Sequence, residues 1–341
     1  MGEIVMIKIG LDAMGGDFAP KEAVLGAYAA VEKFDDIEVI LYGIESEILK
    51  FVSIEHPRVK VVHCEQVIEM DVKDPALAIR HQKDSSLVRA CKDAKLGAID
   101  GVVSAGATGA LIAAGTLIVK RLKGVERPAL APIMPTIKKN QYTVLCDAGA
   151  TSEGKAQYLY QNAKIAAIYV KEVLHVAQPR IGLLNIGTEE GKGTELQKEA
   201  YALIAADKEL NFVGNVESKS MISGEVDVIV ADGYSGNIAL KATEGTASSI
   251  FKLLKAELMS STLGKVGGLL LKGVFKGIKE RMDASAVGGA ILLGVAAPVI
   301  KAHGSSDYVA IMNAIGQGRE IVRQNVTEKI TRSIAENRDS S

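Results

Sequence analysis

The sequence lacks the features that mark several classes of protein. It has no tryptophan and three cysteines without a Cys-x-x-Cys pair, which argues against a disulfide framework or a structural zinc site and favours a reducing compartment. None of its five histidines belongs to an HExxH or other paired motif. The N-terminus has neither the basic start nor the apolar run of a signal peptide, and no apolar run reaches the roughly 18 residues of a membrane span. We therefore expect a cytoplasmic protein, unless it is held at a surface by other means.

Net charge is also nearly absent. The 341 residues carry a net charge of −1, so no global field attracts nucleic acid, and we expect no nucleic-acid partner. Two common phosphate-binding signatures are missing, because there is no GxxxxGK[ST] and no strand-linked GxGxxG with a partner acid about 20 residues further on. What is present is 48 % apolar residues in a chain long enough to bury a sizeable core in one large or two ordinary domains.

Short runs rich in β-branched residues alternate with segments of helical period. The predicted strands are Val5–Leu11, Ile37–Tyr42, Val59–His63, Ile99–Val103, Leu130–Ile133, Thr143–Cys146, Ile181–Asn185, Phe212–Val213 and Asp227–Ala231. The predicted helices are Lys21–Lys33, Ser85–Lys95, Thr108–Arg121, Gln157–His175, Thr194–Ala205 and Tyr308–Glu336. This alternation predicts an α/β fold with a mostly parallel sheet covered by helices on both faces. Because no linker is present, we treat 1–336 as one unit with interwoven subdomains and 337–341 as a tail.

Glycine and small polar residues follow most of these strands. In IGLDAMGGDFAP (Ile9 to Pro20), a buried strand ends in Asp12, turns on Gly15 and Gly16, and leads through a second acid into a helix. The same pattern recurs in SAGATGAL, DAGATSEGK, NIGTEEGKGTE, DGYSGNIALK and AHGSSD, which start at Ser104, Asp147, Asn185, Asp232 and Ala302. Glycine loops that lead into helices direct backbone N–H groups outward, which favours anions. We therefore predict one binding site along a single rim of the sheet.

Two polar side chains in these loops could act on a ligand directly. Lys192, between Gly191 and Gly193, is either a charge clamp for a phosphate or a solvated loop lysine. His303, beside Gly304, is either a site residue or a satisfied structural histidine. The other four histidines and the three cysteines are interpreted as structural.

Seven motifs, taken in order, resemble those of the bacterial phosphate acyltransferases of phospholipid synthesis, the PlsX family: IGLDAMGGDFAP, VSAGATGAL, RPALAP, LLNIGTEEGKGTEL, FVGNVE, VADGYSGNIALKATEG and PVIKAHGSSD. The resemblance implies that acyl carrier protein thioester and inorganic phosphate react to give acyl phosphate and free carrier protein. It also implies a three-layer α/β/α, Rossmann-like fold similar to that of isocitrate and isopropylmalate dehydrogenases and phosphotransacetylase, as a homodimer. The chain departs from the family pattern at Ala107 and Thr151, where an asparagine is common.

This reaction is consistent with the absence of a nucleophilic triad. A thiol leaving group has a pKa near 8.5 and departs as thiolate with little help, and phosphate is already largely ionised near neutrality. The protein has to align two reactants and stabilise the oxyanion on the thioester carbonyl, so no cofactor or metal is needed. We assign catalysis to Lys192, Asn237 and His303. Phosphate and substrate binding is assigned to Asp12, Gly15, Gly16, Asp17, Ser104, Gly106, Thr108, Gly109, Asp147, Asn185, Gly187, Thr188, Asp232, Gly233, Lys301, Ser305 and Ser306.

Alternatives remain at three levels. Asn237 is either the amide donor near the carbonyl or a turn residue that tolerates a left-handed angle. A dehydrogenase of the same fold would use a nicotinamide cofactor. Its metal-binding acids could be misread in four aspartates of this chain: Asp12, Asp17, Asp147 and Asp232. A non-enzymatic scaffold at the membrane would consume no thioester. Because the carrier protein is implied to be acidic, we expect a basic surface near the acyl entrance.

The segment 251–282 is predicted to be an amphipathic surface helix or helical hairpin that contacts an anionic membrane. It holds seven Lys or Arg against two Glu, a local charge of +5. Lysines gather on one side of the helical wheel and leucines and valines on the other, although five glycines weaken the helix. The inserting residues would be Leu270, Leu271, Val274 and Phe275, which would place the enzyme on the inner face of the membrane, near a downstream membrane glycerol-3-phosphate acyltransferase. The alternative is a helix packed on the core or in the dimer interface.

Overall fold

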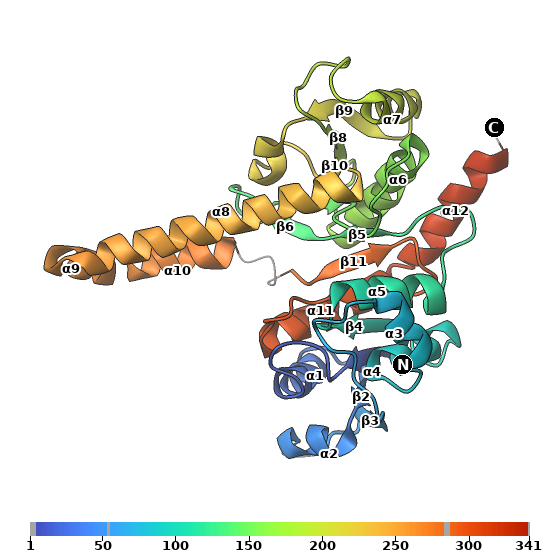
Figure 1. Ribbon diagram of the computed structural model, residues 1–341, viewed down its shortest axis with the longest axis vertical. Helices are drawn as coiled ribbons and strands as arrows, with labels where there is room; N and C mark the ends of the chain where they lie inside the picture. Colours follow the sequence, from blue (N-terminus) through green and yellow to red (C-terminus); the bar gives the residue numbers. More distant parts are fainter. Residues whose placement is uncertain (1–4, 53–54, 283–286, 340–341) are drawn as a thin grey trace.

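The computed structural model describes residues 5–52, 55–282 and 287–339 (Figure 1). Its strands form a seven-stranded sheet in the order β3-β2-β1-β4-β12-β11-β5 and a five-stranded sheet in the order β6-β7-β10-β8-β9. The strands are β1 (Ile7–Asp12), β2 (Ile37–Gly43), β3 (Val59–His63), β4 (Gly101–Ser104), β5 (Ala129–Ala131), β6 (Ile133–Pro135), β7 (Tyr142–Cys146), β8 (Arg180–Leu184), β9 (Asn211–Val216), β10 (Val228–Val230), β11 (Ala290–Leu293) and β12 (Val299–Lys301). The expected mostly parallel arrangement is confirmed. Among the described strands the antiparallel pairs are β11 with β12, β11 with β5, and β6 with β7.

Helices cover both faces of the seven-stranded sheet. On one face lie α1 (Lys21–Lys33) and α11 (Tyr308–Arg323), packed against Val103 and Ile300. On the other lie α4 (Ser86–Lys95) and α5 (Thr108–Ala114), packed against Val102 and Val299. Neighbouring residues of a strand therefore enter different cores, which explains why these strands read as continuous apolar runs.

The five-stranded sheet is covered in the same way. One face carries α6 (Ala156–Val173), α7 (Glu195–Ala206) and α12 (Val326–Asp339), and this core is continuous with that beneath α1 and α11. The other face carries the 3₁₀ helix η3 (Ser218–Ile222) and the first turns of α8 (Gly233–Ser260). Shorter elements are α2 (Glu45–Ile48), η1 (Leu49–Phe51) and α3 (Pro75–His81).

The two sheets meet at Pro132, which separates β5 from β6. The Leu145 amide donates to the Pro132 carbonyl at 3.2 Å, and the Ala148 amide donates to the Leu130 carbonyl at 2.8 Å, so β7 touches both strands. The single strand expected at Leu130–Ile133 is therefore wrong, because the chain changes sheets within it. The expectation of one rim is wrong for the same reason: the glycine loops follow β1, β4 and β12 in one sheet and β7, β8 and β10 in the other.

The other expected elements are confirmed within a few residues, apart from the following differences. The expected helix Tyr308–Glu336 is two helices, divided at Asn325, whose φ is +52°. The expected helix from Thr108 passes after Ala114 into a five-residue π-helical turn and stops before Arg121. Strand β11 and the short helices α2, α3 and η3 were not expected, and α12 extends three residues into the expected tail.

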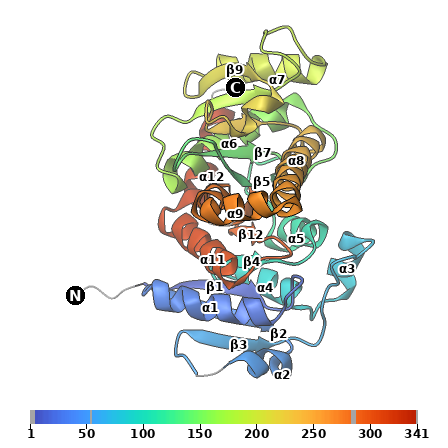
Figure 2. The ribbon, with the colours of Figure 1, turned by 90° about the vertical axis from the view of Figure 1, so that its left-hand side faces the viewer.

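Of the two forms expected for 251–282, a single helix or a helical hairpin, the structure has the hairpin, made of three helices. Helix α8 begins at Gly233, covers the second sheet with its first turns, and then extends far from the body of the protein (Figure 1). At its end α9 (Thr262–Leu270) turns back, and α10 (Lys272–Arg281) returns along α8 (Figure 1). In Figure 2 the hairpin points toward the viewer, with α9 in front of the body of the protein. The break at Leu271 divides the expected helical wheel into two faces.

Candidate active site

Three polar side chains stand in register at the carboxyl ends of three neighbouring strands. Asp12 of β1 pairs with Ser104 of β4, and Ser104 pairs in turn with Lys301 of β12. The three strands are parallel, so their side chains emerge at one edge, where open α/β sheets bind ligands. The sheet thus brings together an acid, a hydroxyl and a cation that lie far apart in the sequence.

Asp12 is buried, with 4 % of its surface exposed, and hydroxyl groups surround it. Its carboxylate accepts hydrogen bonds from the Ser104 hydroxyl at 2.7 Å, the Ser86 hydroxyl at 2.6 Å and the Met14 amide at 3.2 Å. Burial raises the pKa of Asp12, while the bonds from Ser104 and Ser86 oppose that rise. The acid is therefore an organiser of the loops around it, and its oxygens are already engaged by the protein.

Lys301 supplies a positive charge at this edge. Its ammonium group donates to the Ala105 carbonyl at 3.2 Å and also to the Ala302 carbonyl. Burial lowers the pKa of Lys301 to about 8, and the nearby carboxylates of Asp12 and Asp17 oppose the decrease. The ammonium group is therefore charged at neutral pH but held loosely enough to lose its proton in mildly alkaline solution.

Close backbone approaches hold the three loops together. A Cβ atom at Gly15 would lie 2.6 Å from the Gly106 amide nitrogen, so only glycine allows the loops after β1 and β4 to touch. The Asp17 amide donates to the Gly304 carbonyl at 2.8 Å, which joins the loop after β1 to that after β12. We call this set the first loop cluster, and it contains the predicted residues Asp12, Gly15, Gly16, Asp17, Ser104, Gly106, Thr108, Gly109, Lys301, His303, Ser305 and Ser306.

His303 lies at the exposed margin of the first loop cluster. Its Nδ1 atom is 2.8 Å from the Ser305 hydroxyl, and the Ser306 amide donates to the His303 carbonyl at 3.0 Å. Thr108 and Gly109 are also exposed, in the first turn of α5. These residues leave an imidazole and a hydroxyl accessible to a ligand beside the buried Asp12.

On the second sheet, Asp147 organises the loop that follows β7. Its carboxylate accepts four backbone N–H groups at 2.8 to 3.0 Å, from Leu130, Gly149, Ala150 and Thr151. Burial raises its pKa, and these four bonds oppose that rise. Because both oxygens accept backbone N–H groups, Asp147 holds this loop in place.

Asp232, Gly233 and Asn237 lie at the start of α8, next to the Asp147 loop. The Asp232 carboxylate accepts the Ser235 amide at 2.9 Å and caps the helix. A Cβ at Gly233 would lie 2.2 Å from the Thr151 carbonyl oxygen, so the helix start presses directly on the loop. Asn237 is helical, which makes the left-handed turn interpretation wrong, and its Cγ lies 3.4 Å from where a Gly149 Cβ would be.

The loop after β8 carries the predicted cation Lys192. The Asn185 side-chain amide donates to the Lys192 carbonyl at 3.0 Å, and its oxygen accepts the Ile186 amide at 2.8 Å. The Lys192 ammonium is 3.9 Å from Glu189 and half exposed. Lys192 therefore belongs, with Gly187 and Thr188, to the loops of the second sheet, whereas Ser104 belongs to the first loop cluster.

The two sets of loops meet through the segment that Asp147 holds. Leu130, in the first sheet, donates its amide to Asp147, and Ala150 packs against the apolar cluster beneath α4 and α5, which includes Ala107. Within the described residues, no group of three or more His, Cys, Asp or Glu could hold a metal ion. Asp12, Asp147 and Asp232 instead bind separate donors of the protein itself.

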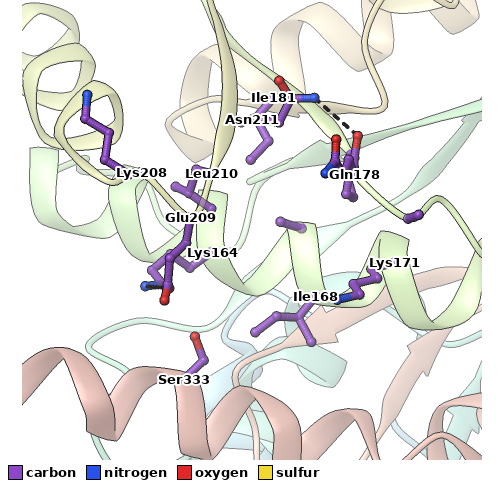
Figure 3. Close-up of a pocket in the computed structure, with 13 residues that line it drawn as sticks. Lys164, Ile168, Lys171, Gln178, Ile181, Lys208, Glu209, Leu210, Asn211 and Ser333 are labelled. Carbon is purple, nitrogen blue, oxygen red and sulfur yellow. Dashed lines mark hydrogen bonds and ion pairs between the residues drawn. The ribbon is translucent and has the colours of Figure 1, made fainter.

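A cavity of about 630 Å³ lies away from these loops, between α6, α12 and the edge of the second sheet (Figure 3). Its buried lysine, Lys164, is 3.0 Å from Asp207 and 3.3 Å from Glu209, and Ser333 approaches from α12. Since Lys164 is neutralised by these internal partners, the cavity holds an ion-pair network that joins α6 to the loop after α7.

Comparisons with known proteins match this arrangement. A family model described as "Fatty acid synthesis protein" matches residues 7–329. The phosphate acyltransferase of Bacillus thuringiensis (strain Al Hakam) is 46 % identical, over 95 % of this chain and 97 % of the relative. The phosphate acyltransferase of Anoxybacillus flavithermus (strain DSM 21510 / WK1) is also 46 % identical, over 97 % of this chain and 99 % of the relative. The chain belongs to the phosphate acyltransferase family.

Solved structures show the fold of this phosphate acyltransferase family member. A phosphotransacetylase from Streptococcus pyogenes superposes with a TM-score of 0.62 at 17 % identity, over 94 % of this chain and 96 % of that one. A putative 4-hydroxythreonine-4-phosphate dehydrogenase from Salmonella typhimurium superposes with a TM-score of 0.52 at 13 % identity, over 94 % of this chain and 100 % of that one. The Rossmann-like α/β/α fold class is confirmed, and the chain is a transferase.

The two departures from the family pattern differ in what they change. Thr151 holds its place through its backbone amide, which donates to Asp147 at 2.8 Å, so the side chain is not needed there. Ala107 is the N-cap of α5 and makes no side-chain capping bond, where an asparagine would supply one.

Sequence reasoning missed Ser86. It could have been found, because α4 begins at the same sheet edge as the loop after β1, and Ser86 opens that helix.

Proposed function

We propose that the protein transfers an acyl group from the thioester of acyl carrier protein to inorganic phosphate, for phospholipid (phosphatidic acid) synthesis. A phosphate oxygen attacks the thioester carbonyl carbon, the carbon–sulfur bond breaks, and the carrier thiolate leaves and takes up a proton. The observation that carries the proposal is the row of Asp12, Ser104 and Lys301 in a member of the phosphate acyltransferase family. This row places a partly buried cation beside glycine loops, an arrangement that favours a phosphate dianion.

Phosphate binds at the first loop cluster in this proposal. The Lys301 ammonium neutralises part of the phosphate charge, and Thr108 and Gly106 contribute hydroxyl and backbone donors. Asp12 engages Ser104 and Ser86, which keeps the loops in place without presenting its own charge to the phosphate. His303 and Ser305, at the exposed margin, contact the phosphate from the solvent side.

The second set of loops receives the thioester in this proposal. Asn237, beside Gly149, donates its side-chain amide to the carbonyl oxygen as negative charge develops on it. Lys192 is half exposed on its own loop, and it closes over the phosphate as the two sets of loops approach. No cofactor takes part, because the leaving thiolate and the ionised phosphate need alignment and electrostatic stabilisation.

We further propose that the enzyme works as a homodimer at the inner surface of the membrane and passes acyl phosphate to a membrane glycerol-3-phosphate acyltransferase. Support comes from the helical hairpin, on which Leu270 is 80 % exposed, Val274 57 % and Leu271 45 %. Phe275 is partly buried and contributes less than the other three. Within the described part of the chain, no helix is long and apolar enough to cross a bilayer. The exposed lysines of the hairpin also suit the acidic carrier protein.

The test measures acyl phosphate directly. Purified protein is incubated with phosphate and palmitoyl-carrier protein, and the product is trapped with hydroxylamine as a hydroxamate. We expect phosphate-dependent product, a loss on the order of 100-fold for Asn237→Ala, and a raised KM for phosphate in Lys192→Ala. Lys198→Ala is the matched control, because Lys198 lies on α7 and pairs with Glu195 at 3.0 Å.

The outcomes separate the alternatives. A scaffold would release no carrier protein in the presence of phosphate, and a dehydrogenase would bind a nicotinamide cofactor in the presence of magnesium. If Lys192→Ala and Asn237→Ala both kept full activity, the assignment of these two residues would be wrong even if the reaction were confirmed.

A further inference from the structure

An apolar groove of about 820 Å³ runs along α8 in the described structure and begins beside the second set of loops. Its walls are the side of α8 that faces η3, the 3₁₀ helix itself, and the end of α10. Met221 and Ile222 of η3 and Ile238 of α8 provide large apolar side chains. Ala239, Ala242 and Ala247 leave the space between them open.

The groove begins at the edge of the second sheet that carries the site loops. Its polar end is marked by Ser235, in the first turn of α8, and by Ser218, two residues after β9 ends. The Ser235 amide is bound to Asp232 at 2.9 Å, so this end adjoins the cap of α8. The Asn215 side chain, at the end of β9, donates to the Glu189 carbonyl at 2.8 Å and joins this edge to the Lys192 loop.

From that end the groove leads away from the polar site toward the hairpin. The span on α8 from Ser235 to Phe251 is about 24 Å at about 1.5 Å per residue, comparable with an extended long-chain fatty acid. The far end is lined by Phe251, Ile278 and Met282, all apolar. Ser218, Lys219 and Ser235 supply polar groups near one end, and the rest of the lining is mostly apolar, with the side chains of Thr243 and Thr246 among the alanines. This distribution matches a ligand with a polar head and a long apolar tail.

We propose that this groove binds the acyl chain of the thioester, with its carboxyl end at Ser218 and Ser235 and its methyl end toward Phe251. The inference rests on the proposed acyl transfer and names the part of the protein that selects chain length. The acyl chain is the occupant because the groove opens at the edge where the thioester is positioned. The small side chains of Ala239, Ala242 and Ala247 leave room for a hydrocarbon chain along α8.

The test uses substitutions that fill the groove at two depths. Ala242→Phe lies about 7.5 Å nearer the polar end than Ala247→Phe. Activity is measured with octanoyl-, lauroyl- and palmitoyl-carrier protein. We expect Ala242→Phe to lower kcat/KM for the palmitoyl substrate at least about tenfold and to spare the octanoyl substrate. Ala247→Phe should shift the limit to longer chains, so that lauroyl is accepted and palmitoyl is not.

Ser248→Phe is the matched control, because Ser248 is exposed on the opposite side of α8 and does not line the groove. It should leave the chain-length profile unchanged. Circular dichroism and thermal unfolding check that each variant is folded, and Ala242→Val replaces Ala242→Phe if the latter does not fold.

Three results would overturn the inference. Equal changes for all three chain lengths, or none, would show that the groove does not hold the chain. A change in sedimentation of Ala242→Phe with an unaltered profile would assign the groove to an interface between copies. If the unmodified protein made no acyl phosphate from any carrier thioester, the proposed function itself would fail. The unmodified protein therefore tests the function, and the variants test the groove.

Discussion

The Ser104 hydroxyl lies 2.7 Å from the buried carboxylate of Asp12, on the neighbouring strand of a parallel pair. The same hydroxyl oxygen accepts the Gly106 amide at 3.0 Å, so one serine links the acid at the end of β1 to the glycine loop after β4. A buried carboxylate without hydrogen-bond donors destabilises the folded protein. The stability of the first loop cluster therefore depends on the hydrogen bonds that the Asp12 carboxylate accepts.

Replacing Ser86 tests this dependence. Ser86→Ala removes a donor at 2.6 Å from the buried carboxylate, and we expect the free energy of unfolding to fall by about 1–3 kcal/mol. The pKa of Asp12 should rise further, because one of the bonds that opposes the effect of burial is lost. Urea unfolding at neutral pH measures the change.

Ser85→Ala is the control for that experiment. Ser85 is equally buried, but it donates to the uncharged Gln82 carbonyl at 2.8 Å. Its removal should cost about 1 kcal/mol or less. If the free energy of unfolding fell equally in the two variants, a hydrogen bond to the charged Asp12 carboxylate would contribute no more to stability than one to an uncharged carbonyl.

Gly233 and Gly245 lie on the same helix, α8, but replacing each by alanine should change the stability of the protein in opposite directions. A Cβ at Gly233 would meet the Thr151 carbonyl oxygen at 2.2 Å and the Asp147 carboxylate at 2.5 Å, so Gly233→Ala should destabilise the protein by about 1–3 kcal/mol or more. It should also lower activity by displacing the loop that Asp147 holds. Thermal unfolding and the acyl phosphate assay measure both effects.

The paired variant, Gly245→Ala, places a methyl group where nothing lies within 4 Å. It should stabilise the helix by roughly 0.5–1 kcal/mol, because alanine loses less backbone freedom than glycine. A stabilised Gly233→Ala would contradict the contact between the start of α8 and the Asp147 loop.

Lys301 makes stability depend on pH in the alkaline range. In the folded protein its pKa is about 8, below the ordinary value of 10.5. Below pH 8 the group is protonated in both states, and burial of its charge lowers the free energy of unfolding by the full amount. Between about pH 8 and 10.5 the unfolded chain binds the proton and the folded protein does not. The contribution of Lys301 to the free energy of unfolding therefore rises with pH across this window.

Lys301→Met isolates that contribution. At neutral pH the free energy of unfolding of this variant should exceed that of the unmodified protein by the largest amount. The difference should decrease toward pH 10.5. The KM for phosphate of the unmodified enzyme should rise above pH 8 as the ammonium charge is lost. A flat difference across the window would show that Lys301 has an ordinary pKa.

The hairpin is tested on vesicles. Changing Leu270 and Phe275 together to glutamate places two negative charges among exposed lysines and leucines, and binding to anionic vesicles should weaken at least about tenfold. Activity on carrier-protein substrate in solution should be kept. Flotation with phosphatidylglycerol vesicles measures binding, and Leu270→Glu alone shows the effect of the more exposed position.

The control makes the same change of charge elsewhere. Leu96 and Leu203, which are 78 % and 39 % exposed, lie outside the hairpin, and their joint replacement by glutamate should leave vesicle binding as it was. If both double variants bound equally well, or if the hairpin variant lost its folded structure, the segment would be a packing or dimer element.

Local patterns in the sequence located most elements of the fold. The helix Lys21–Lys33 and the strand Val59–His63 match the structure residue for residue, because apolar period and capping depend on nearby residues. Strand β11 was not predicted from the sequence, because its four apolar residues follow two glycines and pair antiparallel with other strands of the sheet. The break at Leu271 escaped for a related reason: a helical wheel shows the side of a helix but not where the helix ends.

The roles of individual site residues were less predictable than their positions. Asp12 and Asp147 were expected to bind substrate, yet hydroxyls and backbone amides of the protein occupy their carboxylates. Whether an acid at a strand end faces a ligand or an internal donor depends on which loops fold against it. That choice involves contacts such as Ser86 to Asp12, which are 74 residues apart in the chain.

By itself, the sequence determined the α/β class, the glycine loops at the strand ends and the family, since each depends on residues close together along the chain. The tertiary structure alone decided that these loops belong to two sheets, that Asp12, Ser104 and Lys301 stand in one row, and that α8 carries an apolar groove from the site to the hairpin. The physical reason is strand register. Hydrogen bonding between parallel strands aligns residues that the sequence separates by about 100 positions or more, and only the packing of both sheets into a common core selects that alignment.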